Sequence, residues 1–428
     1  MHTTNEDAEM NISPGSNFSR ASVVCWAAGA WLAAAAGLFA AEDWPQFLGP
    51  SRNGVYQGKV LPVAWKKSPP VVWKRAVGQG YSGPVATDGK VILFHREKNQ
   101  EVVECMAGDT GKTLWKTESP TAYRSSFGFG EGPRATPCVK DGRVYVHGAE
   151  GVLQCLELET GKRVWSVDTV KKFKIPKGFF GLACSPLVEN GKVLMNNGGS
   201  EEAGAVAFDA KTGKTAWTAG TDPASYSSGV LATIQGKPHL VFFTRTGLLD
   251  LDPSNGKILH QMRWRARINA SVNAATPLVV DDMIFLTTSY RTGAVLLKPD
   301  GDSLNTVWSN DDSMSCHYNT CVHRDGFLYG IHGRQEYGPS LRCVELKTGK
   351  VRWSEEKYRA GFMTLVGDNL LMLRDDGELV LAAASPEKYQ PLAASNILSG
   401  VVRAPSAYAG GYFLARNEDT LVCVKLGE

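Results

Sequence analysis

The sequence predicts an all-β chain that folds as an eight-bladed β-propeller with four-stranded blades. Two recurring segments support this prediction, one a turn followed by a tryptophan and the other the start of an apolar strand. The third observation is that the 428 residues include 45 glycines and show little helical periodicity. Short strands between glycine-containing turns, repeated at a fixed period, are typical of propeller blades.

The tryptophan repeat is most complete at residues 207–217, Ala-Phe-Asp-Ala-Lys-Thr-Gly-Lys-Thr-Ala-Trp. Glycine supplies the positive φ that ends a tight turn, and the flanking residues alternate as a strand does. Each copy therefore predicts a strand, a turn and a second strand with an indole that docks against the next repeat. The turn glycines are Gly111, Gly161, Gly213 and Gly349. The docking tryptophans are Trp73, Trp115, Trp165, Trp217, Trp308 and Trp353, with weak copies near His260 to Trp264 and at Tyr389.

The second recurring segment counts the blades independently. It begins an apolar strand with a serine or threonine, a proline and an apolar residue, and a hairpin turn such as Asn190-Gly191 follows it. Clear copies lie at residues 82–85, 136–138, 185–187 and 276–278, and weaker ones at 229–231, 320–322, 363–365 and 404–406. Eight starts at the period of a four-stranded blade predict eight blades.

The two chain ends complete one blade between them. The strand of Trp73 has no earlier part of its repeat in front of it, and the last repeat, residues 420–426, lacks an outgoing tryptophan strand. Pairing the strand of Trp73 with the strand of Cys423 leaves no open edge in the ring.

The chain divides into three parts. Residues 1–41 are predicted to be a signal peptide with a long polar n-region, because an uncharged apolar run from Ala21 to Ala41 is followed by Glu42 and Asp43. An uncleaved N-terminal anchor is the alternative. Residues 42–70 form an extended, proline-rich lead-in, and residues 71–428 form the propeller. We expect an exported protein in the periplasm or the extracellular space, or one anchored in the inner membrane.

The formal net charge of +3 does not favour binding to nucleic acid or to a membrane surface. We expect a monomer, with membrane contact only through an uncleaved anchor. Among the nine cysteines, Cys105, Cys155 and Cys343 each precede a repeat tryptophan by ten residues, which predicts buried free thiols. Cys316 and Cys321 are the local pair that could close a loop.

The repeat resembles the PQQ-binding-like β-propeller family, whose docking pattern is Ala-x-Asp-x-x-Thr-Gly-Lys-x-x-Trp. Residues 207–217 match it in full, and the start at Trp44-Pro45-Gln46-Phe47 is similar to that of secreted bacterial members. The family includes PQQ-dependent alcohol dehydrogenases and the outer-membrane assembly lipoprotein BamB. The resemblance thus implies the fold and leaves both catalysts and scaffolds open as functions.

The residues do not favour catalysis. In the dehydrogenases, the resemblance implies a quinone, a calcium ion held by oxygens, an Asp base and two adjacent cysteines, and this chain has no Cys-Cys pair. We therefore predict no catalytic residue, cofactor or metal, and assign PQQ and calcium only to the dehydrogenase alternative. His317, His323 and His332 match no metal signature. Residues 128–132, Gly-Phe-Gly-Glu-Gly, are interpreted as a connection between blades rather than a phosphate loop.

The loops that enter the innermost strands are the predicted binding site, because they converge at the mouth of the central channel. The candidate mouth residues are Tyr81, Arg134, Phe180, Tyr226, Asn273, His317, Tyr318, Arg359 and Arg403. Aromatic side chains and arginines often carry binding energy at interfaces. The prediction is an exported, non-catalytic scaffold that binds a protein or polysaccharide partner in the cell envelope. A carbohydrate-binding propeller and a PQQ-dependent alcohol or sugar dehydrogenase are the alternatives.

Overall fold

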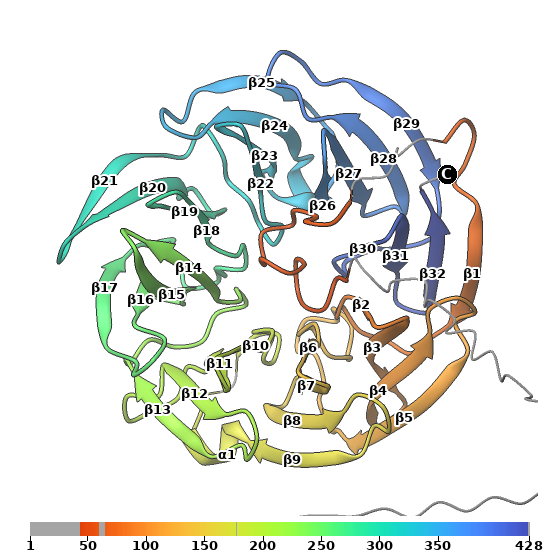
Figure 1. Ribbon diagram of the computed structural model, residues 1–428. Coiled ribbons are helices and arrows are strands. Elements are labelled where there is room, and N and C mark those ends of the chain that lie inside the picture. Colours follow the sequence, from red (N-terminus) through yellow and green to blue (C-terminus); the bar gives the residue numbers. More distant parts are fainter. Residues whose placement is uncertain (1–42, 60–64, 177, 427–428) are drawn as a thin grey trace, which may run out of the picture. The chain divides into compact units, whose positions relative to one another are not determined.

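A computed structural model describes residues 43–59, 65–176 and 178–426. The strands form eight four-stranded antiparallel sheets, arranged as blades around a central channel (Figure 1). The eight-bladed all-β fold predicted from the two recurring segments is confirmed. The predicted signal peptide, residues 1–41, lies outside the described residues. In the described part of the chain, no helix has the length and apolar character of a membrane span.

The first four blades follow one another in the sequence, each running from its inner to its outer strand. Blade 1 consists of β2 (Val85–Thr87), β3 (Lys90–Glu97), β4 (Gln100–Ala107) and β5 (Thr113–Pro120). Blade 2 consists of β6 (Cys138–Lys140), β7 (Arg143–His147), β8 (Val152–Glu157) and β9 (Arg163–Asp168). Blade 3 consists of β10 (Leu187–Glu189), β11 (Lys192–Asn196), β12 (Ala205–Asp209) and β13 (Thr215–Ala219). Blade 4 consists of β14 (Val230–Ile234), β15 (Lys237–Phe243), β16 (Gly247–Leu251) and β17 (Ile258–Arg263). A short helix α1 (Thr169–Phe173) links blades 2 and 3.

Blades 5 to 7 repeat this order. Blade 5 consists of β18 (Leu278–Val280), β19 (Met283–Thr288), β20 (Gly293–Asp300) and β21 (Ser303–Asn310). Blade 6 consists of β22 (Val322–Arg324), β23 (Phe327–His332), β24 (Ser340–Glu345) and β25 (Val351–Glu355). A 3₁₀ turn, Gln335–Tyr337, lies between β23 and β24. Blade 7 is β26 (Gly361–Val366), β27 (Asn369–Arg374), β28 (Glu378–Ala383), β29 (Pro391–Asn396).

Blade 8 is built from both ends of the described chain. Its three inner strands are β30 (Ala407–Ala409), β31 (Tyr412–Arg416) and β32 (Thr420–Lys425), and its outer strand is β1 (Val71–Ala76). β1 pairs antiparallel with β32, and Trp73 lies opposite Cys423. The pairing predicted from the orphan tryptophan strand is therefore present, and it gives blade 8 the same four strands as the other blades.

Each repeat tryptophan joins its blade to the next one. The indole Nε1–H of Trp165, for example, donates to the carbonyl of Ala210 at 3.0 Å, and the turn at Gly213 packs on its ring. The corresponding bonds run from Trp73 to Gly108, Trp115 to Leu158, Trp217 to Pro253, Trp308 to Leu346 and Trp353 to Ser385. Gly111, Gly161 and Gly349 lie in the same way against Trp73, Trp115 and Trp308.

The core lies between the faces of neighbouring blades. One buried cluster joins Leu194 and Ala207 of blade 3 to Leu240 and Leu249 of blade 4. All eight cysteines from Cys105 to Cys423 are buried free thiols in the structure. The Sγ atoms of Cys316 and Cys321 lie 3.4 Å apart.

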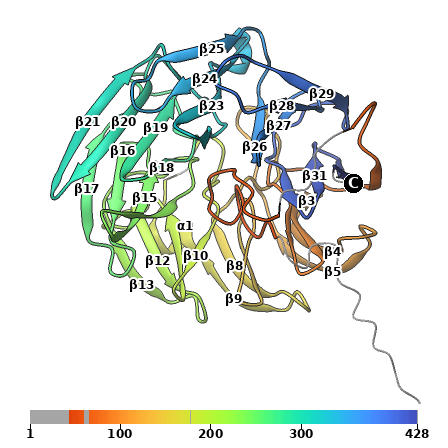
Figure 2. The same ribbon diagram turned by 45° about the horizontal axis from the view of Figure 1, so that its top comes forward.

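The segment 43–59 crosses the centre of the ring (Figures 1 and 2), and we call it the channel strap. Trp44 forms an antiparallel bridge with Ala86 of β2, and the amide of Tyr56 donates to Leu365 of β26 at 2.9 Å. The buried guanidinium of Arg52 donates to the carbonyls of Ser185 and Pro186, at 3.1 and 2.9 Å. The first part of the expected lead-in, residues 42–70, is thus a packed segment that ties together the inner strands of several blades.

Candidate functional site

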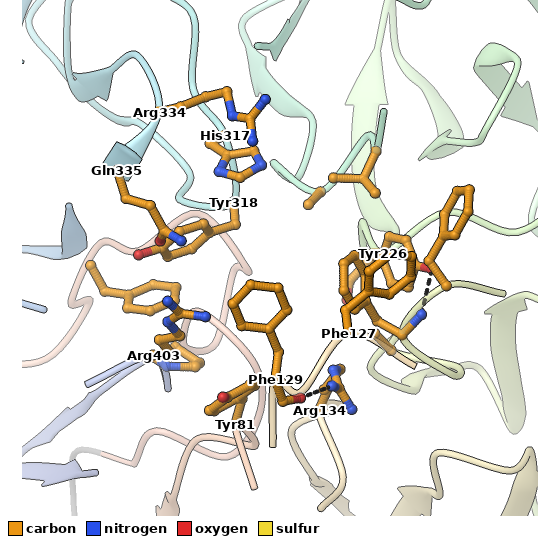
Figure 3. Close-up of a pocket in the computed structure, with 18 of the residues that line it drawn as sticks. Tyr81, Phe127, Phe129, Arg134, Tyr226, His317, Tyr318, Arg334, Gln335 and Arg403 are labelled. Carbon is orange, nitrogen blue, oxygen red and sulfur yellow. Dashed lines mark hydrogen bonds between the residues drawn. The ribbon is translucent and has the colours of Figure 1, made fainter. Parts of the chain in front are cut away.

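A cavity of about 330 Å³ opens at the end of the channel where the chain enters the inner strands. Seven of the nine residues predicted at the channel mouth line this cavity (Figure 3). They are Tyr81, Arg134, Phe180, Tyr226, His317, Tyr318 and Arg403. Phe47 of the channel strap also contributes to the lining. Loops far apart in the sequence therefore converge on one cavity.

The other two predicted residues do not line it. Asn273 is fully buried, and its Nδ2 donates to the carbonyl of Thr244 at 2.8 Å, so its amide supports a loop. Arg359 points its Nε at Asp375 and Asp376, at 2.9 and 3.1 Å. Sequence spacing placed both residues on the correct loops, but it could not give the direction of their side chains.

One wall of the cavity is aromatic. The ring of Phe127 lies 5.8 Å from that of Phe179 and 5.4 Å from that of Phe180, and Phe180 lies 5.5 Å from Tyr226. Phe127, Phe129 and Phe179 are 53, 37 and 41% exposed, which is unusual for phenylalanine. Clusters of exposed aromatic rings are typical of surfaces that bind a partner.

The aromatic wall is the part of the site that sequence reasoning missed. Phe129 lies in the glycine-rich run 128–132 and Phe127 directly before it, in the loop between β5 and β6 of the next blade, which fits the interpretation of the run as a blade connection. Phe179 lies in the connection between α1 and β10. The sequence did contain a signal for this wall, because the segments Phe-Gly-Phe and Phe-Phe place apolar rings in polar, glycine-containing loops.

Arg134 and Arg403 have different surroundings. The Nη2 of Arg134 donates to the carbonyl of Phe129 at 2.6 Å, and its guanidinium lies 5.5 Å from the ring centre of Tyr81 (Figure 3). Arg134 thus holds the loop that carries the aromatic wall. Arg403 lies 4.9 Å from the ring centre of Phe129, and within the described residues it has no hydrogen-bond or ion-pair partner. Its charge is available to a ligand.

The opposite wall is polar and partly unsatisfied (Figure 3). The Nε2 of His317 lies 2.9 Å from the hydroxyl of Tyr290, but its Nδ1 and the hydroxyl of Tyr318 are buried without a partner. Burial, together with the charge of Arg334, lowers the pKa of His317 to about 4, so its imidazole is neutral at pH 7. Burial also raises the pKa of Tyr318. Both unpaired atoms are shielded from solvent although their side chains line the cavity, so this wall holds unused hydrogen-bonding capacity just behind its surface.

The cavity lining does not fit the calcium–quinone site of the dehydrogenase alternative. Calcium takes six to eight oxygen ligands. Among the described residues that line the cavity, Glu336 is the single carboxylate, and its Oε2 lies 3.2 Å from the Nε of Arg334. Cys316 and Cys321 are buried outside the lining.

Solved structures with a similar fold have diverse functions. BamB from Moraxella catarrhalis matches with 14% identity and a TM-score of 0.60, covering 83% of this chain and 97% of that one. A quinohemoprotein alcohol dehydrogenase from Comamonas testosteroni matches with 16% identity and a TM-score of 0.52, covering 92% and 82%. The computationally designed Ika8 protein matches with 11% identity and a TM-score of 0.55, covering 83% and 99%. At these identities the similarity shows the fold alone.

Sequence comparison gives the family. A comparison with curated proteins found no match. The model of the family described as outer membrane protein assembly factor BamB matches residues 98–355 and 261–426. Together these two overlapping ranges cover more than half of the chain, including all or part of every blade. The chain therefore belongs to the outer membrane protein assembly factor BamB family.

Proposed function

We propose that this protein is a binding scaffold of the cell envelope. Its channel-mouth cavity captures a polypeptide segment that carries an apolar side chain beside an acidic group. The observation that carries this proposal is the unpaired guanidinium of Arg403 next to the exposed ring of Phe129. An aromatic ring and a carboxylate on one short segment would satisfy both groups at once.

Two further points support a protein partner. The family is named for outer membrane protein assembly, which is work on polypeptides in the envelope. The side chains of His317 and Tyr318 line the cavity, and the Nδ1 of His317 and the hydroxyl of Tyr318 have no hydrogen-bond partner. Both atoms are shielded from solvent, so a rotation of either side chain would bring it to the carbonyls and amides of a bound peptide backbone. The cavity chemistry favours this function over a dehydrogenase, because it supplies aromatic rings and cations rather than calcium ligands.

The test uses two labelled, end-capped five-residue peptides, in which phenylalanine flanks either a central glutamate or a central lysine. Fluorescence anisotropy with the full-length protein should show the glutamate peptide binding at least about tenfold more tightly, a difference of ~1.4 kcal/mol. Arg403→Gln should remove most of this preference. Arg359→Gln is the matched control, because Arg359 is an exposed arginine that pairs with Asp375 outside the cavity.

Failure of both peptides to bind would contradict the proposal. Equal binding of the two, or an unchanged preference in Arg403→Gln, would show that the cavity does not read the acidic group.

A further inference from the structure

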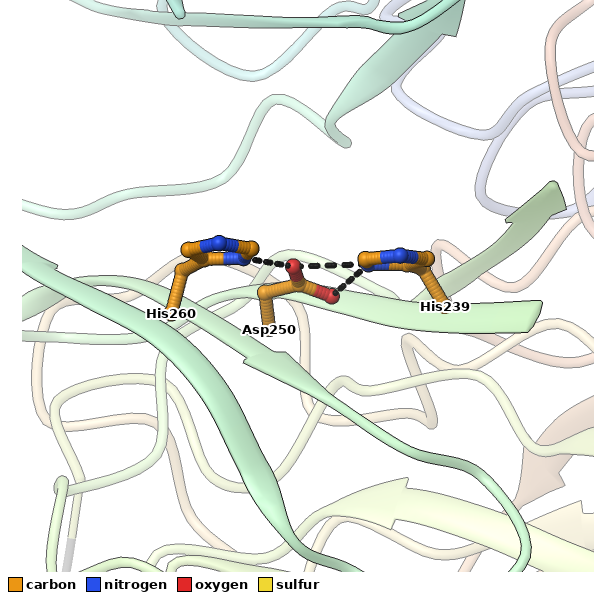
Figure 4. A group of neighbouring side chains, drawn as sticks. All are labelled: His239, Asp250 and His260. Carbon is orange, nitrogen blue, oxygen red and sulfur yellow. Dashed lines mark hydrogen bonds and ion pairs between the residues drawn. The ribbon is translucent and has the colours of Figure 1, made fainter. Parts of the chain in front are cut away.

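Blade 4 carries a buried cluster of ligand-type side chains away from the channel. His239 of β15, Asp250 of β16 and His260 of β17 lie side by side across three neighbouring strands (Figure 4). The Nδ1 atoms of both histidines lie 2.8 Å from the Oδ2 of Asp250, and the two ring planes differ by 7°. Asp250 is fully buried, and His239 and His260 are 5% and 6% exposed.

The cluster replaces the docking pair of the repeat. In blade 3, Ala207 lies opposite Trp217, and in blade 4 Asp250 lies opposite His260 at the same register position. The Nε2 of His260 lies 3.0 Å from the carbonyl of Gly301 in blade 5, where six of the other blades place an indole N–H. His260 thus keeps the bond between blades but adds a second nitrogen that tryptophan lacks.

That second nitrogen faces a lone pair. When the Nε2–H of His260 donates to Gly301, the neutral ring presents an unprotonated Nδ1 to the carboxylate of Asp250. Two lone pairs at 2.8 Å repel each other, so this contact needs either a proton on Nδ1, which makes His260 an imidazolium, or a metal ion bound by both groups. A carbonyl that fixes the far nitrogen of a histidine is also the usual arrangement behind a metal-binding imidazole.

Asp250 also lacks a permanent cation. Within the described residues, its ion-pair partners are the two imidazoles, and neither lysine nor arginine lies within ion-pair distance. The other group of this kind, which includes His95 and Glu104, differs in this respect. Glu104 lies 2.7 Å from the Nη2 of Arg75 and 3.6 Å from the Nζ of Lys116, so its charge is already balanced. A buried carboxylate without such a partner needs a cation.

We propose that His239, Asp250 and His260 of blade 4 bind a zinc ion, which fixes the ring of His260 in the orientation that bonds to Gly301 of blade 5. Two imidazole nitrogens and a carboxylate are a donor set that zinc accepts, with metal–ligand bonds of about 2.0–2.2 Å. Asp250 offers both oxygens, because its Oδ1 also lies 3.0 Å from the Nδ1 of His239. The ion neutralises the buried charge of Asp250, and His260 keeps the bond to blade 5 that an indole makes elsewhere.

The first measurement is the zinc content of the purified full-length protein by mass spectrometry after dialysis against a weak chelator. We expect about one zinc per chain. Protein stripped by a strong chelator should regain a higher thermal unfolding midpoint with zinc but not with magnesium. Cobalt added to the stripped protein should give the visible absorption of low-coordinate Co²⁺ bound to nitrogen and oxygen.

The variant Asp250→Ala/His260→Trp introduces the alanine–tryptophan pair of blade 3, so it should fold but lose the zinc and the cobalt spectrum. His239→Gln keeps the bond to Gly301 and should weaken zinc binding at least about tenfold. His95→Gln is the matched control and should retain full zinc content. Absence of zinc and cobalt binding in the wild type, or metal content unchanged in Asp250→Ala/His260→Trp and His239→Gln, would show that the cluster is a hydrogen-bonded triad only.

Discussion

Trp73 and Cys423 lie opposite each other in the ladder between β1 and β32, although they come from the two ends of the described chain. The indole is 8% exposed, and its Nε1–H donates to the carbonyl of Gly108 in blade 1 at 2.7 Å. One side chain therefore contributes both to closure of blade 8 and to its attachment to blade 1.

Trp73→Ala should weaken the closure of the ring. The substitution leaves a cavity and removes the donor to Gly108, so we expect a loss of about 3–5 kcal/mol in the free energy of unfolding. Urea unfolding followed by circular dichroism measures it. Leu114→Ala is the control, because Leu114 is 52% exposed and should change stability by less than about 0.5 kcal/mol. Equal losses in the two variants would contradict the closing role.

Gly213→Ala should be more destabilising than Gly191→Ala. Both glycines have a φ of 71°, so the backbone strain is the same. A Cβ on Gly213 would lie 2.7 Å from the ring of Trp165, whereas a Cβ on Gly191 meets nothing within 4 Å. We expect about 1 kcal/mol for Gly191→Ala and at least about 1–3 kcal/mol more for Gly213→Ala. Thermal unfolding of both variants gives the difference, and similar midpoints would show that the turn does not pack tightly on the indole.

Glu101→Gln should make stability less dependent on pH between about 4.5 and 7. Burial raises the pKa of Glu101 to about 7 from its ordinary value of 4.5, although its carboxylate accepts a hydrogen bond from the amide of Ala149. The folded state holds the proton more tightly than the unfolded state, so wild-type stability falls as pH rises through this window. The penalty at pH 8 is about 3 kcal/mol. Chemical unfolding at pH 4.5 and pH 8 should show Glu101→Gln gaining relative to the wild type at the higher pH.

Glu104→Gln should change the pH dependence of stability in the opposite direction. Burial opposes ionisation of Glu104, but hydrogen bonds from His95 and Thr113 and the charge of Arg75 outweigh it and lower its pKa to about 2. Its stabilisation is present above pH 4.5 and is lost as pH falls toward 2. The variant should therefore be less stable than the wild type at neutral pH and should approach it in acid. The same pH trend in both variants would contradict the two assignments.

Arg52→Met should loosen the channel strap while the ring stays intact. The buried carbonyls of Ser185 and Pro186 would lose their donor, at a cost of about 1–3 kcal/mol. Hydrogen exchange followed by mass spectrometry should show faster exchange in the peptide that contains Trp44. A peptide covering β27 should exchange as in the wild type. Unchanged exchange at Trp44 would mean that Arg52 does not hold the strap.

The fold could be predicted from the sequence because the residues that form each turn and strand also dock one blade on the next. The turn glycine, the strand alternation and the indole recur at fixed offsets, and the orphan Trp73 predicted its pairing with Cys423. The position of the loops followed from the blade count. Seven of nine predicted mouth residues therefore line one cavity.

The sequence did not predict the directions of side chains in the loops or the contacts made by segments outside the repeat. Phe127 and Phe179 lie in irregular loops, and Arg359 turns toward Asp375. The paired replacement at Asp250 and His260 was readable in principle, since an acid and an imidazole stand where the repeat has alanine and tryptophan. This segment was interpreted as a weak copy of the tryptophan repeat, because a single sequence does not show that the two substituted side chains face each other.

The channel strap precedes every blade in the chain, yet its contacts come from strands made at very different times. Trp44 bridges to β2, which is synthesised soon after it, whereas Tyr56 bonds to β26 of blade 7. The site for this segment does not exist until most of the circle has been assembled. We therefore expect the strap to reach its final position only after blade 7 has formed.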